Sequence, residues 1–491
     1  MPPTLAALWN ESFAADAFHI RDTHVQLKFP EFISSRKTIS EIVIVGSGPA
    51  AMATAYALEQ KGISCVLLES GEPDKAERWD IKTNGFTAVS YGVPESYPEL
   101  HVRRQPGGGL NVWSGWCSAL REVNFARPDL PTYPSWPITK ADLVPHYREA
   151  ASWLKIPDFE KSLEDGVEVA DSGLTVKLFR FSPPLRFSGE LAQHVATSQK
   201  ITLVTGATVA GLEGSGGRIT GIEVLAAGGQ HKVPCEGAVV LAGGAVGNAR
   251  ILALSGAAGI AESARAFVGK YFFEHPHCYS VANIAFSPEM EDRLADKAYW
   301  SQGFISLAPT KAFLEKTGST DFNFQLWPIP GNELEPREQA ISHNHEKIYG
   351  RKPQFYRASL GMEQAVHVPT DIVLDADTLA RKNDGHLSLD LGVQKQVIHV
   401  AKKWIQANGA CAWVGPEKEP PIVAVGHLMG TTRMSRDPAN GVVDGNCLVH
   451  GTTNLFVAGG SVFPTGGFTN PTFTIAALAF RLGGHLAKEI Q

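Results

Sequence analysis

Residues 41–51 read Glu-Ile-Val-Ile-Val-Gly-Ser-Gly-Pro-Ala-Ala, and this stretch decides the fold class. The apolar, β-branched run 41–45 predicts a buried strand that stops at Gly46, and Ala50–Lys61 predicts a helix with small residues on one face. A second apolar run, Cys65–Glu69, predicts another strand. Strand, glycine-rich turn, helix and strand within about 30 residues form the β-α-β unit that nucleotide-binding folds require.

The glycine spacing of this turn is suited to a dinucleotide. Gly46 permits the tight turn, and Gly48 lets the backbone approach a pyrophosphate held at the start of the helix. Glu69 ends the second strand and is placed to accept hydrogen bonds from an adenosine ribose. An acid at this position does not separate NAD from FAD, because both contain ADP. The residues expected to contact the cofactor in this unit are Gly46, Ser47, Gly48, Ala50, Ala51, Glu69 and Ser70.

The composition is that of an ordered globular protein, with 491 residues, of which 44% are hydrophobic and 19% charged. The net charge of −6 is mild and there is no dense Lys/Arg block, so we expect no nucleic-acid partner. No apolar run is long enough to span a membrane, and residues 1–40 lack the pattern of a signal peptide, so the expected location is cytoplasmic. Six cysteines without a CxxC motif indicate neither a zinc site nor a disulfide framework.

The rest of the chain divides into four kinds of segment. A glycine and tryptophan cluster at 106–116 predicts an irregular, tightly turned segment, and strands are predicted at 201–212 and 217–226 with a hairpin turn between them. A buried strand is predicted at 239–244, and another at 455–458 precedes a last helix at about 471–489. The region from about 275 to 425 has no nucleotide motif, and we assign it mainly to substrate binding.

Three segments, Gly46–Glu69, Val239–Gly256 and His427–Ala479, together resemble the glucose-methanol-choline (GMC) oxidoreductases. The most specific part is the C-terminal block, in which His-Leu-Met-Gly-Thr-Thr-Arg-Met at 427–434 is followed by Asn-Pro-Thr at 470–472. Within the family the chain looks closest to pyranose oxidase and the sugar and sugar-acid dehydrogenases. The resemblance implies FAD as the cofactor.

The resemblance also implies the architecture, an α/β fold with a Rossmann-type FAD-binding domain and an interleaved substrate-binding domain built on a β-sheet with helices. The expected boundaries are an N-terminal extension at 1–40, an FAD-binding domain at 41–120, 195–275 and 425–491, and a substrate-binding domain at 121–194 and 276–424.

In that branch of the family a histidine and an asparagine face the flavin, and they match His427 and Asn470. Alcohol oxidation removes a hydride from carbon and a proton from oxygen, so a neutral imidazole near the flavin is a suitable base. Asn470 is expected to orient the same hydroxyl. Glu274 and His275, in another segment that resembles the family, are expected to be structural.

The resemblance implies further contacts with FAD. The glycines before Trp113 match the family's segment beneath the isoalloxazine, and Val112 stands where pyranose oxidases often carry the histidine that bonds covalently to the flavin, so we expect non-covalent FAD. The additional residues expected at the cofactor are Gly108, Asn111, Val112, Ser114, Val209, Gly243, Gly460, Ser461 and Thr472.

The predicted function is oxidation of a CH–OH group of a sugar, glycoside, amino sugar or cyclitol by hydride transfer to flavin N5. The electron acceptor is oxygen or a quinone or protein, and the sequence is compatible with an oligomer. The alternative is a non-redox flavoprotein of the same fold, such as a hydroxynitrile lyase. The pairs His275 with His277 and His343 with His345 lack further ligands at persuasive spacing, so no metal site is predicted.

Overall fold

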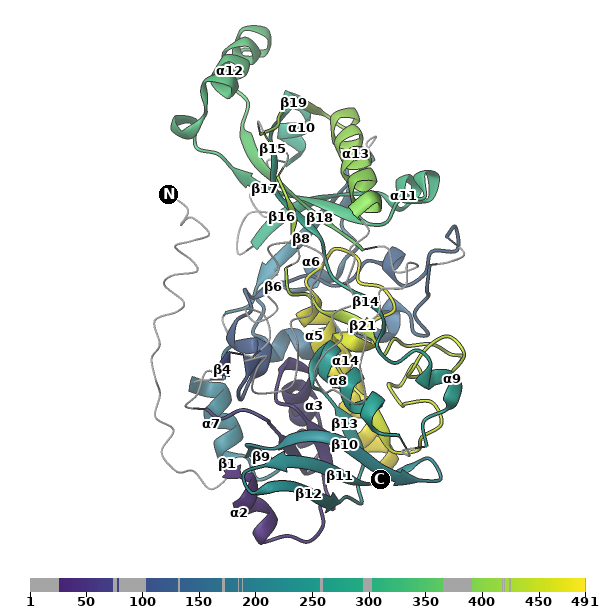
Figure 1. Cartoon of the computed structure of the whole chain (residues 1–491). Helices are drawn as coiled ribbons and strands as arrows, with labels where there is room; N and C mark the ends of the chain where they lie inside the picture. Colours follow the sequence, from purple (N-terminus) through teal and green to yellow (C-terminus); the bar gives the residue numbers. More distant parts are fainter. Residues whose placement is uncertain are drawn as a thin grey trace.

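The structure is a computed structural model, and it describes residues 26–73, 77–78, 103–130, 133–169, 173–183, 185–187, 189–256, 259–294, 303–364, 391–416, 418, 420–423 and 425–490. Two β-sheets lie at opposite ends of the molecule, with the segments of the C-terminal block between them (Figure 1). Residues 1–25 of the expected N-terminal extension lie outside the described part.

At one end, six of the described strands form a parallel sheet in the order β1-β9-β3-β2-β13-β22. From β2 the chain runs to β3 on one side, whereas β13 and β22 lie on the other, which makes β2 the topological switch point where such folds bind ligands. The turn Gly46–Gly48 follows β2 directly. The strand bounds are β1 Gln26–Lys28, β2 Ile42–Val45, β3 Cys65–Leu68, β9 Ile201–Thr205, β13 Val239–Leu241 and β22 Leu455–Val457.

Helices and a small antiparallel sheet cover this parallel sheet. α3 packs on α14, which also contacts α5, and α8 follows β13 and contacts β10. Strands β10, β11 and β12 form the antiparallel sheet, whose apolar residues share one hydrophobic core with the parallel sheet. The bounds are α3 Pro49–Glu59, α5 Lys140–Trp153, α8 Gly244–Leu254, α14 Pro471–Ile490, β10 Thr208–Ser215, β11 Arg218–Ala226 and β12 Gly229–Pro234.

At the other end, nine of the described strands form a second sheet, in the order β19-β15-β18-β17-β16-β8-β6 with β20 and β7 on its edges. All of its strand pairs are antiparallel. The bounds are β6 Trp116–Cys117, β7 Val167–Glu168, β8 Leu174–Phe181, β15 His277–Phe286, β16 Gly303–Pro309, β17 Phe322–Pro328, β18 Phe355–Met362, β19 Ala410–Val414 and β20 Ile422–Val423.

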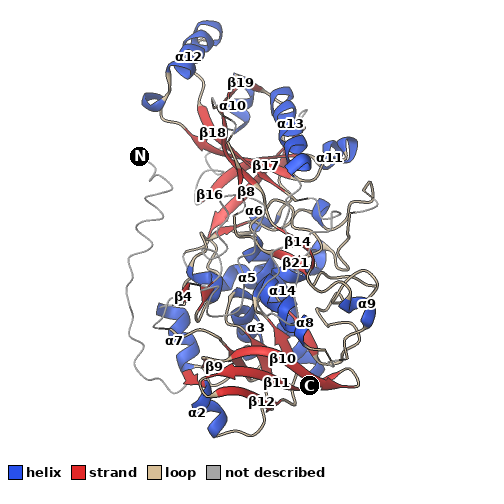
Figure 2. Cartoon of the chain, viewed as in Figure 1, coloured by secondary structure: helices blue, strands red, loops and turns tan. Residues whose placement is uncertain are grey.

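Helices cover the outer face of this second sheet (Figure 2). α10, α11 and α13 supply Met290, Leu314 and Trp404 to a hydrophobic core with the sheet. The opposite face therefore looks toward the FAD-binding end. The bounds of these helices are α10 Pro288–Leu294, α11 Lys311–Thr317 and α13 Leu391–Ala407, and α12 at Pro336–Tyr349 projects beyond them.

A short pair of strands joins the two ends. β14 (Lys270–Phe273) pairs with β21 (Met429–Thr431), and Phe273 lies opposite Met429. This pairing requires a glycine, because a Cβ on Gly430, where φ is +77°, would lie 2.0 Å from the Tyr271 carbonyl oxygen. The pairing places the residues after Phe273 beside those before Met429.

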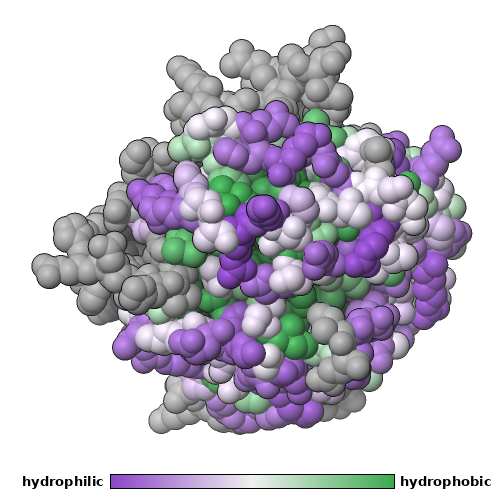
Figure 3. Space-filling model, turned by 90° about the horizontal axis from the view of Figure 1, so that it is seen from below, coloured by the Kyte–Doolittle hydropathy of each residue, from purple (hydrophilic) through white to green (hydrophobic). Residues whose placement is uncertain are grey.

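The remaining described elements are short. They are α2 Phe29–Ser34, α6 Glu160–Leu163, α7 Gly189–Thr197, α9 Glu262–Arg265, β4 Glu77–Arg78, β5 Arg103–Arg104, η1 Gly108–Asn111, η2 Glu122–Asn124, η4 Gly331–Glu333 and η5 Gly460–Val462. Seen from below the view of Figure 1, the end of the molecule near the parallel sheet has a surface on which hydrophilic and hydrophobic residues are mixed (Figure 3).

The α/β architecture with two interleaved parts is confirmed, and so is the β-α-β unit of β2, α3 and β3. The prediction of a single strand at 201–212 is wrong, because Gly206, with φ of +67°, divides this segment into two strands. β9 lies in the parallel sheet, and β10 lies in the small antiparallel sheet. The expected domain boundaries stay a prediction. In the structure β1 belongs to the parallel sheet, α5 packs on α14, and residues from both segments share the hydrophobic core of that sheet.

Candidate functional site

The turn after β2 has the shape predicted for a pyrophosphate site. Gly46 has φ of +103°, and a Cβ there would lie 2.7 Å from the Ala242 carbonyl oxygen at the end of β13. A Cβ on Gly48 would meet nothing within 4 Å, so there is open space at the start of α3. Ala50 and Ala51 are buried and let α3 lie close to the sheet. The amide groups at this helix start therefore face a space that an anion can enter.

Glu69 lies at the carboxyl end of β3, beside this turn. Its side chain is 5% exposed and accepts hydrogen bonds from the Ser47 hydroxyl and, at 2.8 Å, from the Gly71 amide. The Ser70 hydroxyl lies 3.3 Å from the same carboxylate. Burial raises the pKa of Glu69, and the hydrogen bonds from Ser47 and Gly71 oppose that shift. The carboxylate is thus fixed where an adenosine ribose is expected.

The second glycine segment packs against the first. A Cβ on Gly108 would lie 3.0 Å from the Gly48 Cα, and the Gly107 amide donates to the Ser47 hydroxyl at 3.2 Å. Two loops that are 60 residues apart therefore meet at the start of α3. This close approach explains why residue 108 is a glycine.

The other residues predicted from this segment have different surroundings. The side-chain amide of Asn111 donates to the Pro106 carbonyl oxygen at 2.8 Å and accepts from the Phe187 amide at 2.9 Å, so it holds two loops together. Ser114 is exposed and Val112 is half-buried. Val209 is buried on β10, opposite Val224. Their contacts with FAD remain predictions.

The ends of β13 and β22 bring the remaining predicted residues together. The Gly243 amide donates to the Asn248 side chain at 2.7 Å, and the Asn248 amide donates to the Ser461 hydroxyl at 2.9 Å. Gly460 lies against the backbone before β21, since a Cβ there would be 2.8 Å from the Leu428 carbonyl oxygen. Thr472 is half-buried in the first turn of α14.

These residues fit FAD. The space at the start of α3 suits a pyrophosphate, the buried Glu69 suits a ribose, and the glycine segment at Gly107–Gly109 adjoins both. From there, the Gly460 backbone leads to the loop that carries His427.

His427 and Asn470 lie side by side, although 43 residues separate them in the sequence. The Asn470 Nδ2 atom is 3.2 Å from His427 Nε2, and both side chains are half-buried. His427 stands two residues before β21 and Asn470 directly before α14. An amide N–H can only donate, so Nε2 of His427 carries the lone pair in this contact.

His275 fixes that tautomer from the other side. Its Nε2 atom lies 3.2 Å from the Gly466 carbonyl oxygen, which can only accept, so this nitrogen carries the proton. Its Nδ1 is then an acceptor, and it lies 3.1 Å from His427 Nδ1, which must donate. Burial of His275 lowers its pKa to about 3, and the neighbouring His277 adds to that shift, so the His275 ring is neutral. The hydrogen-bond chain places the lone pair of His427 on Nε2, the nitrogen that faces Asn470.

Glu274 holds the backbone of the His427 loop. Its carboxylate accepts from the amide of His427 at 3.1 Å and from that of Val425 at 3.2 Å. Its own amide donates to the Gln364 side chain at 2.9 Å. Burial raises the pKa of Glu274 to about 7, although the backbone hydrogen bonds favour the ionised form.

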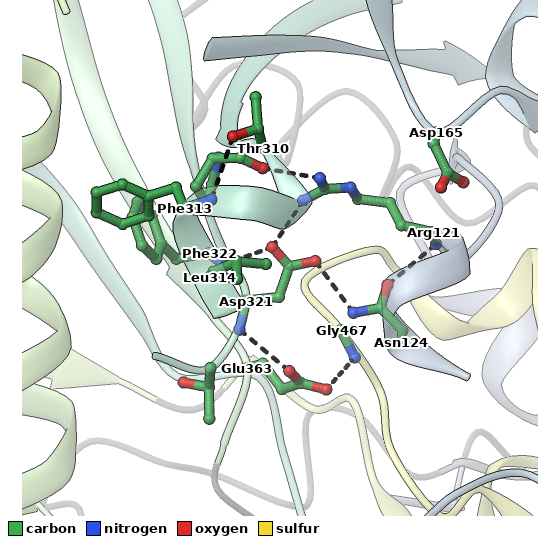
Figure 4. Close-up of polar contacts among 12 residues, drawn as sticks. Arg121, Asn124, Asp165, Thr310, Phe313, Leu314, Asp321, Phe322, Glu363 and Gly467 are labelled. Atoms are coloured by element: carbon green, nitrogen blue, oxygen red, sulfur yellow. Dashed lines mark hydrogen bonds and ion pairs between the residues drawn. The ribbon is translucent and has the colours of Figure 1, made fainter. Parts of the chain in front are cut away.

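A second buried carboxylate, Glu363, holds the loop that leads to Asn470 (Figure 4). It accepts from the Gly467 amide at 2.8 Å and from the Asp321 amide at 3.1 Å. Asp321 in turn pairs with Arg121 at 2.8 Å. Burial and the neighbouring Asp321 raise the pKa of Glu363 to about 7.

The sequence predicted structural roles for Glu274 and His275, and no pattern in it pointed to Glu363. The structure places His275 in contact with His427, and Glu274 and Glu363 at the two loops that carry His427 and Asn470. The one local feature that could have drawn attention to Glu274 and His275 was the Glu-His-Pro sequence that follows the strand at 270–273. Within the described residues, no three His, Cys, Asp or Glu side chains gather in a way that could hold a metal ion. None of the described helices has the length and apolar character needed to cross a membrane.

The chain is similar to known oxidoreductases in sequence and in fold. Residues 411–479 match the family model of the GMC oxidoreductases. The 2-methyl-1,2-propanediol dehydrogenase of Mycolicibacterium austroafricanum is 23% identical over 92% of this chain and 96% of its own length. The pyranose 2-oxidase of Lyophyllum shimeji is 26% identical over 51% of this chain and 44% of its own length. The formate oxidase structure from Aspergillus oryzae is 15% identical, with a TM-score of 0.54 over 92% of this chain and 98% of that one, which shows the shared fold.

The fold and the paired loops define a flavin-dependent oxidoreductase. The match at residues 411–479 makes the chain similar to the GMC oxidoreductases, and this similarity supports FAD as its cofactor.

Proposed function

We propose that this protein oxidises a CH–OH group of a sugar, glycoside, amino sugar or cyclitol to the carbonyl, with His427 as the base and Asn470 orienting the hydroxyl. The observation that carries the proposal is the 3.2 Å contact between Asn470 Nδ2 and His427 Nε2, which sets a donor and an acceptor side by side, where one substrate hydroxyl can replace their mutual contact and meet both. The similarity to a pyranose 2-oxidase and to a diol dehydrogenase favours a substrate rich in hydroxyl groups.

Each side chain has a distinct part in this scheme. FAD, when bound, supplies the hydride acceptor at flavin N5. His427 Nε2 takes the hydroxyl proton, because its other nitrogen is committed to His275. The Asn470 amide donates to the substrate oxygen and so fixes which lone pair faces the base. A neutral imidazole, whose ordinary pKa is about 6.5, suits proton removal near neutral pH.

The experiment is anaerobic stopped-flow reduction of the bound flavin by a panel of pyranoses, glycosides, amino sugars and cyclitols. With a substrate that bleaches the wild-type flavin, His427→Ala should slow reduction by roughly 10²–10⁴-fold, the usual contribution of a general base. Asn470→Ala should cost less, because the base remains in place. The matched control is His343→Ala, which removes an exposed imidazole on α12 and should leave the rate unchanged.

Two outcomes would contradict the proposal. Near-normal reduction by His427→Ala would exclude this residue as the essential base. A flavin that no alcohol on the panel bleaches would favour the lyase-like alternative, in which FAD stays oxidised. Repeating the reaction with oxygen and with a quinone decides which of them accepts the electrons.

A further inference from the structure

One face of β17 looks from the second sheet toward the catalytic pair. Side chains alternate along a strand, and Phe322, Phe324 and Leu326 point into the core beneath the outer helices. Asn323, Gln325 and Trp327 therefore share the opposite face.

His277 shows where this opposite face lies. A Cβ on Gly361, which pairs with both Asn323 and His277, would be 2.6 Å from Asn323 Oδ1 and 3.2 Å from His277 Nε2. The His277 ring lies 6.4 Å from that of His427, centroid to centroid. The amide of Asn323 is thus one side chain away from the catalytic base.

Asn323 is the unusual member of this row. It is completely buried, and neither its amide nitrogen nor its amide oxygen has a hydrogen-bond partner. A buried amide without partners is destabilising, and such groups in native proteins commonly meet a ligand or water. Gly361 lies directly opposite, so the chain has no side chain there to serve as that partner.

Gln325 extends the polar row. His277 Nδ1 donates to the His275 carbonyl oxygen at 3.0 Å, so His277 Nε2 accepts from the Gln325 amide at 3.3 Å. Gln325 is 2% exposed, so its orientation is fixed by this contact. An amide donor and an amide acceptor held in this way are suited to hydroxyl groups, which both donate and accept.

An aromatic surface continues the same face. Trp327 lies 5.9 Å from Trp116 on β6, and Trp116 lies 6.3 Å from Phe181 on β8, between ring centroids. All three side chains are half-buried. Aromatic rings of this kind present flat apolar area beside a polar edge. The C–H face of a pyranose ring matches such a surface.

A hydrogen-bonded frame holds this strand against the catalytic loop. Glu363 accepts from the amides of Asp321 and Gly467, as Figure 4 shows. Asp321 precedes Asn323 by two residues, and Gly467 precedes Asn470 by three. The position of Asn323 relative to Asn470 is therefore set by short, buried connections.

We propose that Asn323, Gln325 and Trp327 form the subsite that recognises an uncharged pyranose ring, with the two amides on its hydroxyls and the indole on its C–H face. This inference rests on the proposed function. It narrows the substrate class to a neutral pyranose or glycoside, because none of the three side chains carries a charge that would select an amino sugar or a sugar acid.

The test uses the FAD-loaded enzyme and anaerobic flavin reduction by D-glucose, D-galactose, D-xylose and D-glucosamine, followed by the monodeoxy analogues of the neutral sugar that reacts best. The wild type should prefer that sugar to one deoxy analogue by roughly 10- to 100-fold in kcat/KM, a usual range for a hydrogen bond to a buried group. Asn323→Leu should abolish this preference while the rate with that analogue stays within a few-fold of wild type.

Two further variants keep the test decisive. Asn283→Leu is the matched control, because Asn283 lies on β15 of the same sheet but donates to Glu338 on α12, so it should leave the preference intact. If Asn323→Leu does not retain FAD, Gly361→Ala places a methyl group against the Asn323 amide instead and should likewise erode the preference.

The outcomes separate this subsite from the reaction itself. If Asn323→Leu lost activity on all sugars in equal proportion, or kept the preference for the sugar over its deoxy analogue, the proposed subsite would be refuted. The proposed roles of His427 and Asn470 would be unaffected by either result. If D-glucosamine reduced the flavin faster than every neutral sugar, or if only simple alcohols reduced it, the assignment of a neutral pyranose as the substrate would be wrong. A flavin that no alcohol reduces would instead overturn the proposed function.

Discussion

Replacing His275 tests whether it sets the tautomer of His427, the proposed base. Its two ring nitrogens have separate partners, His427 Nδ1 at 3.1 Å and the Gly466 carbonyl oxygen at 3.2 Å. An asparagine side chain places its polar atoms near the position of Nδ1, whereas a glutamine reaches the position of Nε2. His275→Asn therefore keeps an acceptor for His427 and loses the contact with Gly466. His275→Gln does the reverse.

The expected effect follows from the value of one buried hydrogen bond. In the wild type, the Nδ1–H form of His427 is favoured by its bond to His275, and only that form has a lone pair on Nε2 for the substrate proton. Loss of a hydrogen bond to a buried group costs about 1–3 kcal/mol. At 1.36 kcal/mol per tenfold change, His275→Gln should slow flavin reduction by roughly 5- to 150-fold. His275→Asn should stay within about threefold, well inside that range.

The assay is the limiting rate of anaerobic flavin reduction, measured with FAD content as the control for folding. His275 is neutral across the working range because burial lowers its pKa to about 3. The pH dependence of reduction should therefore keep the same midpoint in both variants, and only the plateau of His275→Gln should fall. Wild-type rates in His275→Gln, or equal losses in both variants, would refute the assignment of the tautomer to this contact.

Three further predictions concern the cofactor and stability. Glu69→Ala should weaken FAD retention by about 1–3 kcal/mol because it removes hydrogen bonds from a buried ribose site; unchanged affinity in equilibrium dialysis would mean that the ribose lies elsewhere. Denaturation should release intact FAD, since Val112 cannot form a histidyl link, and flavin that stays on the denatured chain would contradict non-covalent binding. Glu274 has a pKa of about 7 in the folded state against about 4.5 when unfolded, so the folded state holds its proton to higher pH and its contribution to stability should fall as pH rises from about 4.5 to about 7. Thermal unfolding across that range should show a shallower decline in Glu274→Gln than in wild type, and parallel curves would argue against the raised pKa.

The parts of the site that sequence reasoning reached are those encoded locally. The turn Gly46–Gly48 and Glu69 lie within one β-α-β unit, so a short window contains the whole pattern. His427 and Asn470 were matched through the resemblance to a family, and the 3.2 Å contact between them is consistent with that assignment.

The parts that it missed depend on pairing between distant segments. His275 reaches His427 only because β14 pairs with β21 over an irregular register that no periodicity reveals. The face of β17 could not be recognised either, since a strand that alternates phenylalanine with asparagine and glutamine does not say which side is buried until its partners are known. Gly206 likewise divides a continuous apolar pattern into two sheets through its positive φ.

The proposed catalytic residues, His427 and Asn470, belong to the C-terminal block, but residues outside that block largely set their geometry. Glu274 fixes the backbone amide of His427, and Glu363 fixes that of Gly467 in the loop before Asn470. Each carboxylate adjoins a strand of the second sheet, because Glu274 precedes β15 and Glu363 follows β18. A displacement of that sheet would therefore move the base and the orienting amide together with the polar face of β17. Burying two carboxylates is costly, and a shared frame for substrate and catalytic side chains is the physical reason that we infer for their presence.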